Sequence, residues 1–202
     1  LNSNRITYVA YMFRYMNPQY YFINVSLYQG GSSSVWYAAF GVYSAFQNGT
    51  ARSTATQSVK NQVDTWKNTV NSLSSEAEKV KMIHDLIVQK VDYNTDIYGN
   101  SFNEDTAYTQ SVYSVFCMDK TVCAGYAQAF EMMCNGVGVD CIAVTSDDHE
   151  WNKVRINDSW YNVDCTWADQ STIDYEYFER SDAVYDADLA SYASSHAEES
   201  YW

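Results

Sequence analysis

The chain has 202 residues, of which 47% are hydrophobic, so it is long enough and apolar enough for one domain with a substantial core. Its 25 acidic and 12 basic residues give a formal net charge of −13, which argues against nucleic acid or an anionic membrane surface as a partner. The five cysteines contain no C-x-x-C pair, which argues against a thioredoxin motif or a zinc knuckle, and their odd number leaves at least one thiol free.

The first third of the chain includes a long uncharged stretch, residues 15–51, whose lack of charge could suggest a membrane span. Asparagine, proline, glutamine and the Gly30-Gly31 pair interrupt this stretch, so we expect no membrane span in it. The pattern predicts a single domain with an N-terminal extension over residues 1–53, a core over residues 54–170 and an acidic, solvated segment over residues 171–202.

Two helices are predicted at the start of the core. From Thr54, apolar residues recur at spacings of three and four, which predicts a helix that ends near Ser74. Its buried stripe consists of Val59, Val63, Trp66, Val70 and Leu73. Ser75 followed by Glu78 is a capping-box signature that predicts the start of a second helix. The buried face of that helix consists of Val80, Ile83, Ile87 and Val91.

His84 lies on the edge of this second stripe, next to Asp85. We expect it to be a packed, hydrogen-bonded core histidine rather than a catalytic residue. Residues 95–105, which are rich in Asn, Asp, Gly and Ser, are predicted to form a loop.

A third helix is predicted from Val122 to a C-cap at Gly136 and Gly138. One face of this helix carries Tyr126, Phe130 and Met133, with Ala129 and Met132 beside them. Cys123 therefore lies in its first turn, where the helix dipole and unpaired N–H groups favour a thiolate over a thiol.

The small residues Ala124 and Gly125 leave space for a substrate carbonyl near the backbone N–H of Cys123, a potential oxyanion donor. Taken alone, a cysteine at a helix start is also compatible with a simple core residue. The other four cysteines are expected either to lie in the core or to pair in an oxidising compartment. They are Cys117, Cys134, Cys141 and Cys165.

Three extended runs follow, at residues 139–145, 149–156 and 160–167. Asn157 and Asp158 join the last two and predict a two-residue hairpin loop, which pairs Ile156 with Ser159. A helix followed by antiparallel strands predicts an α+β fold.

The predicted register brings two chemically useful side chains together. It places Trp151 opposite Asp164 and His149 opposite Thr166, so that His149 and Asp164 are diagonal neighbours on one face, about 7 to 8 Å apart between backbones. A three-residue loop would break this phase unless a bulge restored it. A carboxylate bonded to one ring nitrogen leaves the other nitrogen for a thiol, so Cys123, His149 and Asp164 form a candidate triad. Taken singly, the histidine and the acid could each be ordinary surface residues.

The segments VCAGYAQAF, HEWN and WYNVDCTWAD resemble, in order and separation, the three sequence blocks of the transglutaminase-like superfamily. Upstream, EKVKMIHDLIVQKVDYN is similar to the helix before the core in bacterial, often secreted, members. The resemblance implies a papain-like α+β fold with a nucleophile helix packed on an antiparallel sheet. It also implies that Cys123 is the nucleophile, His149 the general base and acid, and Asp164 the orienting carboxylate.

The resemblance implies an enzyme that attacks amide bonds of peptide or protein substrates and forms a thioester intermediate. Peptidase, deamidase and transglutaminase activities all remain open. No metal or other cofactor is implied, and an extracellular or cell-surface location is expected from the secreted members. The alternative is a catalytically silent module that binds protein or carbohydrate at the cell surface, using some of the 19 tyrosines. The sequence says nothing about the oligomeric state.

A second oxyanion donor is expected upstream, and Tyr93, Gln110 and Tyr113 are equal candidates for that role.

Four residues near the candidate histidine and aspartate have expected supporting roles. Asp148 and Glu150 flank His149 and are predicted to be rim acids, which could raise the pKa of the histidine and favour cationic substrates such as lysine amines. Trp151 is expected to pack beneath the site rather than bind ligand. Cys165 is expected to lie in the core, because it faces away from the aspartate before it.

Overall fold

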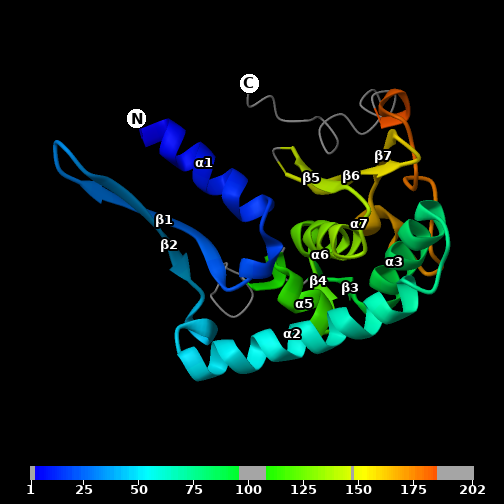
Figure 1. Ribbon diagram of the computed structural model, residues 1–202, viewed down its shortest axis with the longest axis horizontal. Helices are drawn as coiled ribbons and strands as arrows, with labels where there is room; N and C mark the ends of the chain where they lie inside the picture. Colours follow the sequence, from blue (N-terminus) through cyan, green and yellow to red (C-terminus); the bar gives the residue numbers. More distant parts are fainter. Residues whose placement is uncertain (1–2, 96–107, 147, 186–202) are drawn as a thin grey trace.

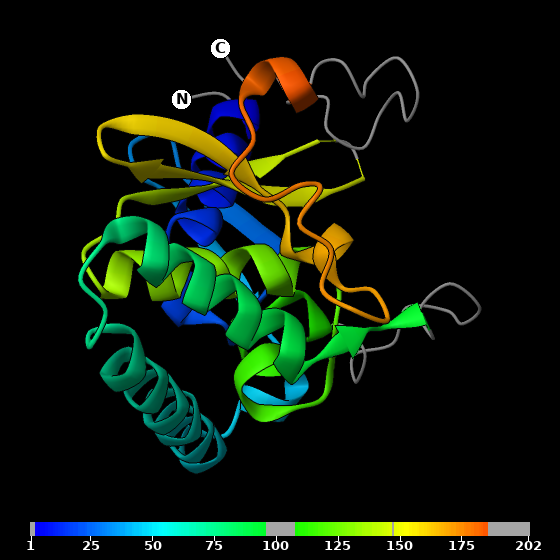
Figure 2. The same cartoon turned by 90° about the vertical axis from the view of Figure 1, so that its right-hand side faces the viewer.

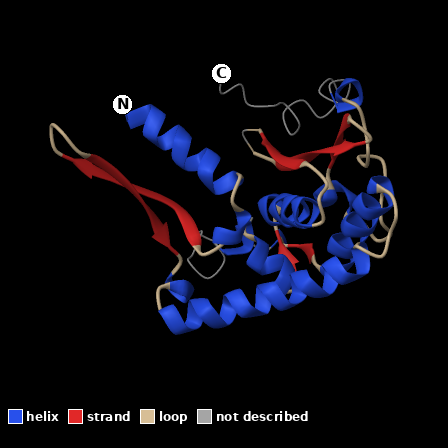
Figure 3. Cartoon of the chain, in the orientation of Figure 1, coloured by secondary structure: helices blue, strands red, loops and turns tan. Residues whose placement is uncertain are grey.

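The computed structural model describes residues 3–95, 108–146 and 148–185 (Figure 1). In its α+β core a central helix lies between a three-stranded antiparallel sheet and a long helix, as Figures 1 and 3 show. The central helix is α6 (Cys123–Gly136), the long helix is α2 (Gly49–Val70), and the sheet consists of β5 (Cys141–Thr145), β6 (Glu150–Ile156) and β7 (Ser159–Val163). The other core elements are α3 (Glu76–Lys90), β3 (Asp92–Tyr93), η4 (Tyr108–Gln110), α5 (Val112–Cys117), β4 (Lys120–Thr121) and α7 (Cys165–Ala168).

Helix α2 has the predicted buried stripe but different ends. It begins five residues before Thr54, because the side chain of Asn48 accepts hydrogen bonds from the N–H groups of Thr50 and Ala51. It ends at Val70, so Leu73 lies beyond the helix rather than on its stripe. The predicted stripe residues within the helix are buried against the core: Val59, Val63, Trp66 and Val70.

Helix α3 confirms the prediction made from its first residues. Ser75 and Glu78 form a complete capping box, in which each side chain bonds the backbone N–H of the other residue. His84 is a fully buried core residue, and its Nδ1 lies 2.9 Å from Oδ1 of Asp85. Most of the predicted loop at residues 95–105 lies outside the described residues.

Helix α6 is buried on more than one face, because the sheet covers one side and the other helices cover the opposite side (Figure 2). The predicted apolar face, with Tyr126, Phe130 and Met133, is fully buried. Gln128 and Glu131 are also buried, although their polarity suggests a solvated face. The helix ends as predicted, with Gly138 at φ +83°, a conformation that favours glycine.

The sheet confirms the predicted hairpin loop, but its paired residues end at Asn152 and Val163, so the predicted pairs Trp151–Asp164 and His149–Thr166 do not form. Asn157 and Asp158 adopt positive φ angles of 49° and 65°, which suits a two-residue hairpin loop, and Ile156 pairs with Ser159. The third predicted strand is too long, because β7 ends at Val163 and the chain then turns into α7. Asp164 is therefore the N-cap of a short helix and not a strand residue.

The N-terminal residues form a helix and a hairpin beside the core. These elements are α1 (Ser3–Tyr15), η1 (Pro18–Tyr20), β1 (Ile23–Gly31), β2 (Trp36–Val42) and η2 (Ser44–Phe46). Figure 1 shows the β1–β2 hairpin projecting away from α6, with α1 alongside it. Gln29 on the hairpin donates a hydrogen bond to the hydroxyl of Thr7 on α1. None of the helices in the described ranges has the length and apolar character that crossing a membrane requires.

Candidate active site

Cys123 is the first residue of α6 and is half-buried. Tight packing around Gly125 holds this end of the helix in place. A Cβ atom at that position would collide with the hydroxyl of Thr121 and lie 3.0 Å from that of Ser114. Gly125 therefore serves close packing, which corrects the expectation that it leaves space for a substrate carbonyl.

A buried hydrogen-bond network under the helix start explains this packing. The hydroxyls of Ser114 and Thr121 lie 2.6 Å apart, and both contact the carbonyl oxygen of Thr109. The N–H of Val122, directly before the cysteine, also points to that carbonyl oxygen, at 3.4 Å. These bonds fix β4 and the first turn of α6 to one another, so the position of the thiol is determined by the core.

Asp164 holds the ring of His149. Its Oδ2 lies 2.6 Å from Nε2 of His149, while its Oδ1 accepts hydrogen bonds from the N–H groups of Thr166 and Trp167 at 2.8 and 3.1 Å. The aspartate is fully buried and the histidine side chain is 7% exposed. Helix α7 thus orients the carboxylate, and the carboxylate orients the imidazole.

With Nε2 at Asp164, the other ring nitrogen of His149 is left for Cys123, whose side chain lies near enough to raise the pKa of the imidazole. Burial lowers the pKa of His149, but the charge and hydrogen bond of Asp164, together with Cys123, outweigh this effect and raise the pKa to about 10. The imidazolium form is therefore favoured at neutral pH. The structure brings the three predicted side chains together in the order sulfur, imidazole, carboxylate.

Two tryptophans contact the His149 ring. Trp151 is 1% exposed and stacks on the ring with centroids 6.1 Å apart, and its Nε1 donates to Oδ1 of Asn162. This agrees with the expectation that Trp151 packs beneath the site. Trp167 on α7 lies 6.0 Å from the same ring. The prediction of a strand through residues 160–167 gave no reason to expect Trp167 here.

Glu150 is not the rim acid that the sequence suggested, because it is 5% exposed at the start of β6 and its Oε1 accepts a hydrogen bond from Nε2 of Gln128 on α6, at 3.5 Å. Burial raises its pKa to about 7, although Arg14 and Gln128 oppose the shift. Burial together with Glu150 raises the pKa of nearby Glu131 to about 8. Asp148 is exposed, as expected of a rim residue.

The candidates for a second oxyanion donor lie in different surroundings. Tyr93 lines a pocket beside α7, and the backbone oxygen of Gln110 accepts a hydrogen bond from Arg14. Tyr113 packs in an aromatic cluster, stacked on Tyr21 with centroids 5.7 Å apart. The role stays open among the three.

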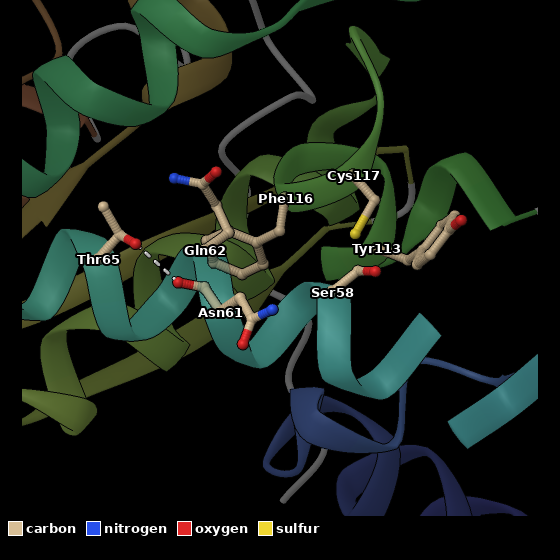
Figure 4. A pocket seen from close by; sticks show the side chains of 7 residues that line it. All are labelled: Ser58, Asn61, Gln62, Thr65, Tyr113, Phe116 and Cys117. Atoms are coloured by element: carbon tan, nitrogen blue, oxygen red, sulfur yellow. Dashed lines mark hydrogen bonds between the residues drawn. The ribbon is translucent and has the colours of Figure 1, made fainter. Parts of the chain in front are cut away.

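A second half-buried thiol, Cys117, lies in a polar pocket of about 450 Å³ between α2 and α5 (Figure 4). The residues that line it include no histidine, aspartate or glutamate. Burial raises the pKa of Cys117, which favours the thiol. The remaining cysteines, Cys134, Cys141 and Cys165, are buried, and none of the five forms a disulfide. Across the described part of the chain, no three His, Cys, Asp or Glu side chains gather in a group that could hold a metal ion.

A comparison of the sequence with protein-family models shows which family the chain belongs to. The sequence model of the transglutaminase-like superfamily matches residues 64–165, half of the chain, including all three side chains of the site. The chain belongs to the transglutaminase-like superfamily. Among solved proteins, this member resembles the one described as "Crystal structure of a TGase", with a TM-score of 0.50 and 13% identity over 91% of this chain and 52% of that one.

Two curated relatives of this superfamily member are the kyphoscoliosis peptidases of Mus musculus and Homo sapiens. Each is 29% identical over 110 residues, a match that covers 46% of this chain and 16% of the relative. The shared region is therefore a small part of a much longer protein.

Proposed function

We propose that this protein catalyses cysteine-dependent acyl transfer or hydrolysis of amide bonds in peptide or protein substrates. The observation that supports it most directly is the hydrogen bond by which Asp164 holds Nε2 of His149, with Cys123 close enough to the same imidazole to raise its pKa. Membership of a superfamily that includes transglutaminases and cysteine peptidases is consistent with this chemistry.

In the first half of the reaction, the thiolate of Cys123 attacks the carbonyl carbon of the substrate amide. The oxyanion that forms lies at the start of α6, where the backbone N–H of Cys123 and the helix dipole stabilise negative charge. The imidazolium of His149 gives its proton to the leaving nitrogen, the C–N bond breaks, and a thioester remains on the sulfur.

In the second half, water or an amine attacks the thioester and His149 takes a proton from it. The carbon–sulfur bond breaks, and the products are an acid or a new amide together with the regenerated thiolate–imidazolium pair. Asp164 stays ionised throughout and supports the positive charge of the ring. The choice between water and an amine determines whether the enzyme is a hydrolase or a transferase.

Alkylation tests the nucleophile directly. With iodoacetamide at pH 5 to 9, we expect rapid modification of Cys123 and slow modification of the other cysteines, mapped by mass spectrometry of tryptic peptides. Replacing His149 with Asn is expected to slow the modification of Cys123. Equal, slow labelling of all five thiols would count against catalysis and in favour of a binding module.

Product analysis then identifies the reaction. The protein is incubated with a peptide digest of a proteome, with and without an added primary amine, and the products are compared with those of Cys123→Ser. New peptide termini indicate a peptidase, a gain of one mass unit at glutamine indicates a deamidase, and incorporation of the amine indicates a transglutaminase. Products that do not depend on Cys123 contradict the proposal.

A further inference from the structure

A pocket of about 430 Å³ lies between β3 and the chain segment that follows α7. In Figure 2 the orange loop after α7 passes beside the green strand β3. The loop is tied at both ends, since the N–H of Asp174 donates to the oxygen of Ala168 and the N–H of Asp164 donates to the oxygen of Tyr177. The walls of the pocket are therefore set by the fold.

The pocket adjoins the candidate triad through two of its walls. Trp167 lines the pocket and also contacts the ring of His149, with centroids 6.0 Å apart. Tyr93, another lining residue, pairs with Thr121, which lies two residues before Cys123. The lining is therefore joined to the His149 ring through Trp167 and to the strand before Cys123 through Tyr93.

Three aromatic rings supply much of the lining: Tyr93, Trp167 and Tyr177. Trp167 and Tyr177 meet edge to face with centroids 4.6 Å apart, which holds both rings in fixed orientations. Aromatic faces of this kind attract ammonium and guanidinium groups as well as apolar groups.

The same pocket is lined by three carboxylates, on Asp169, Asp174 and Glu176, whereas no Lys, Arg or His lies among its described lining residues. Asp169 accepts a hydrogen bond from Tyr126 at 2.6 Å, and Asp174 accepts one from the N–H of Glu176 at 2.8 Å. These bonds use neutral donors, so the negative charge of the carboxylates is not balanced within the lining. A cation in the pocket would balance it.

Thr166 also lines the pocket, and its buried hydroxyl oxygen has no hydrogen-bond partner within the described part of the chain.

We propose that this pocket is a subsite for an organic cation, an ammonium or guanidinium group, on the leaving-group or acceptor side of the substrate. We assign the pocket to the leaving-group or acceptor side because His149 must reach the leaving nitrogen, and the ring of His149 contacts Trp167 in the pocket lining. The bound cation is not the reacting nitrogen, because a nucleophilic amine must lose its proton and the carboxylates would oppose that loss. The inference rests on the proposed function.

The cation could belong to the peptide after the scissile bond or to an added amine, and paired substrates distinguish these two sources. For cleavage, a peptide that the enzyme cuts is made with either lysine or uncharged norleucine within three residues after the scissile bond. For transfer, 1,5-diaminopentane is compared with pentylamine at equal concentrations of free amine. We expect the charged partner of one pair to react about fivefold faster, measured as kcat/KM at low salt.

The double variant Asp174→Asn/Glu176→Gln is expected to reduce this preference to less than twofold, because kcat/KM for the charged substrate should fall toward that for the neutral one. A matched control is Asp140→Asn/Asp158→Asn, which removes two exposed charges beside Arg155 at the far hairpin, and it should keep the preference. Equal rates for both members of both pairs, or a preference that survives in the pocket variant, would overturn the subsite.

A binding measurement separates this inference from the proposed function. In the Cys123→Ser protein, 1,5-diaminopentane should shift the indole N–H resonance of Trp167, assigned with Trp167→Phe, whereas pentanol should not. The pocket variant should abolish the shift. If the protein turns over no substrate, the proposed function fails, and this titration alone decides the subsite: absence of a shift contradicts it.

Discussion

Two half-buried cysteines of the same chain, Cys117 and Cys123, lie only six residues apart and have different surroundings. Cys117 ends α5 and lies in a polar pocket whose lining contains no histidine, aspartate or glutamate, and burial raises its pKa. Cys123 begins α6 and contacts an imidazole that a buried carboxylate holds in place. The expected reactivity of a cysteine therefore depends on a position at a helix start and on a fixed histidine beside it, and not on the volume of the adjoining pocket.

Replacing each cysteine by serine tests this comparison most strongly. Cys123→Ser is expected to lower turnover by at least about a thousandfold, because a serine hydroxyl is a far weaker nucleophile without the thiolate–imidazolium pair. Cys117→Ser is expected to change turnover by less than twofold. The comparison fails if the two variants lose activity to a similar extent while both remain folded by circular dichroism.

Asp164→Asn is expected to have the next largest effect. The amide oxygen can still cap α7, but the charge that supports the imidazolium is lost, so turnover should fall by about 10² to 10⁴-fold. The pKa of His149 should move down from about 10. The alkaline limb of the rate profile of wild-type enzyme, where His149 loses its proton, should therefore move to lower pH in the variant. A profile that keeps its alkaline limb in place contradicts the role assigned to Asp164.

Gly125→Ala tests whether tight packing positions the start of α6. The added methyl group conflicts with Thr121, so we expect a loss of about 1–3 kcal/mol in the free energy of unfolding, measured with urea. Gly49→Ala is the matched control, because no atom lies within 4 Å of a Cβ at that position in the first turn of α2. It should leave stability unchanged or slightly increased.

A further effect concerns Glu131, the buried acid on the same helix. The pKa of Glu131 is raised to about 8, so the folded protein binds a proton that the unfolded chain releases between about pH 4.5 and 8, and stability falls as pH rises through that window. Glu131→Gln removes this dependence, so its gain in stability over wild type should be larger at pH 8.5 than at pH 5 by about 3–4 kcal/mol. A gain that is the same at both pH values contradicts the assignment.

Local patterns predicted much of the core. The stripe of α2, the capping box of α3, the start of α6 at Cys123 and the Asn157-Asp158 turn all depend on residues a few positions apart, and the structure contains each of them. The pairing of Ile156 with Ser159 followed from the turn, because a two-residue loop leaves no freedom in the register. The catalytic roles of Cys123, His149 and Asp164 stay a prediction that the geometry supports.

The features that the sequence predicts wrongly depend on contacts between residues that are far apart in the chain. Asp164 was assigned to a strand because the residues around it favour extended structure, but α7 forms there, and its N–H groups bond the carboxylate. Charge usually marks a surface, and this is why the sequence predicts Glu150 at the rim. In the structure it is buried, and Gln128 and Arg14, from other parts of the chain, lower its pKa against the effect of burial.

Short-range periodicity and turn chemistry specify the α+β class, the helix that begins at Cys123 and the hairpin that brings His149 near Asp164, so these features could be predicted from the residues alone. Long-range packing places Trp167 between the imidazole and an acidic, aromatic-lined pocket, and it also packs Gly125 tightly at the start of α6. Those features arise where segments far apart in the chain meet, and no local pattern encodes the distance between them.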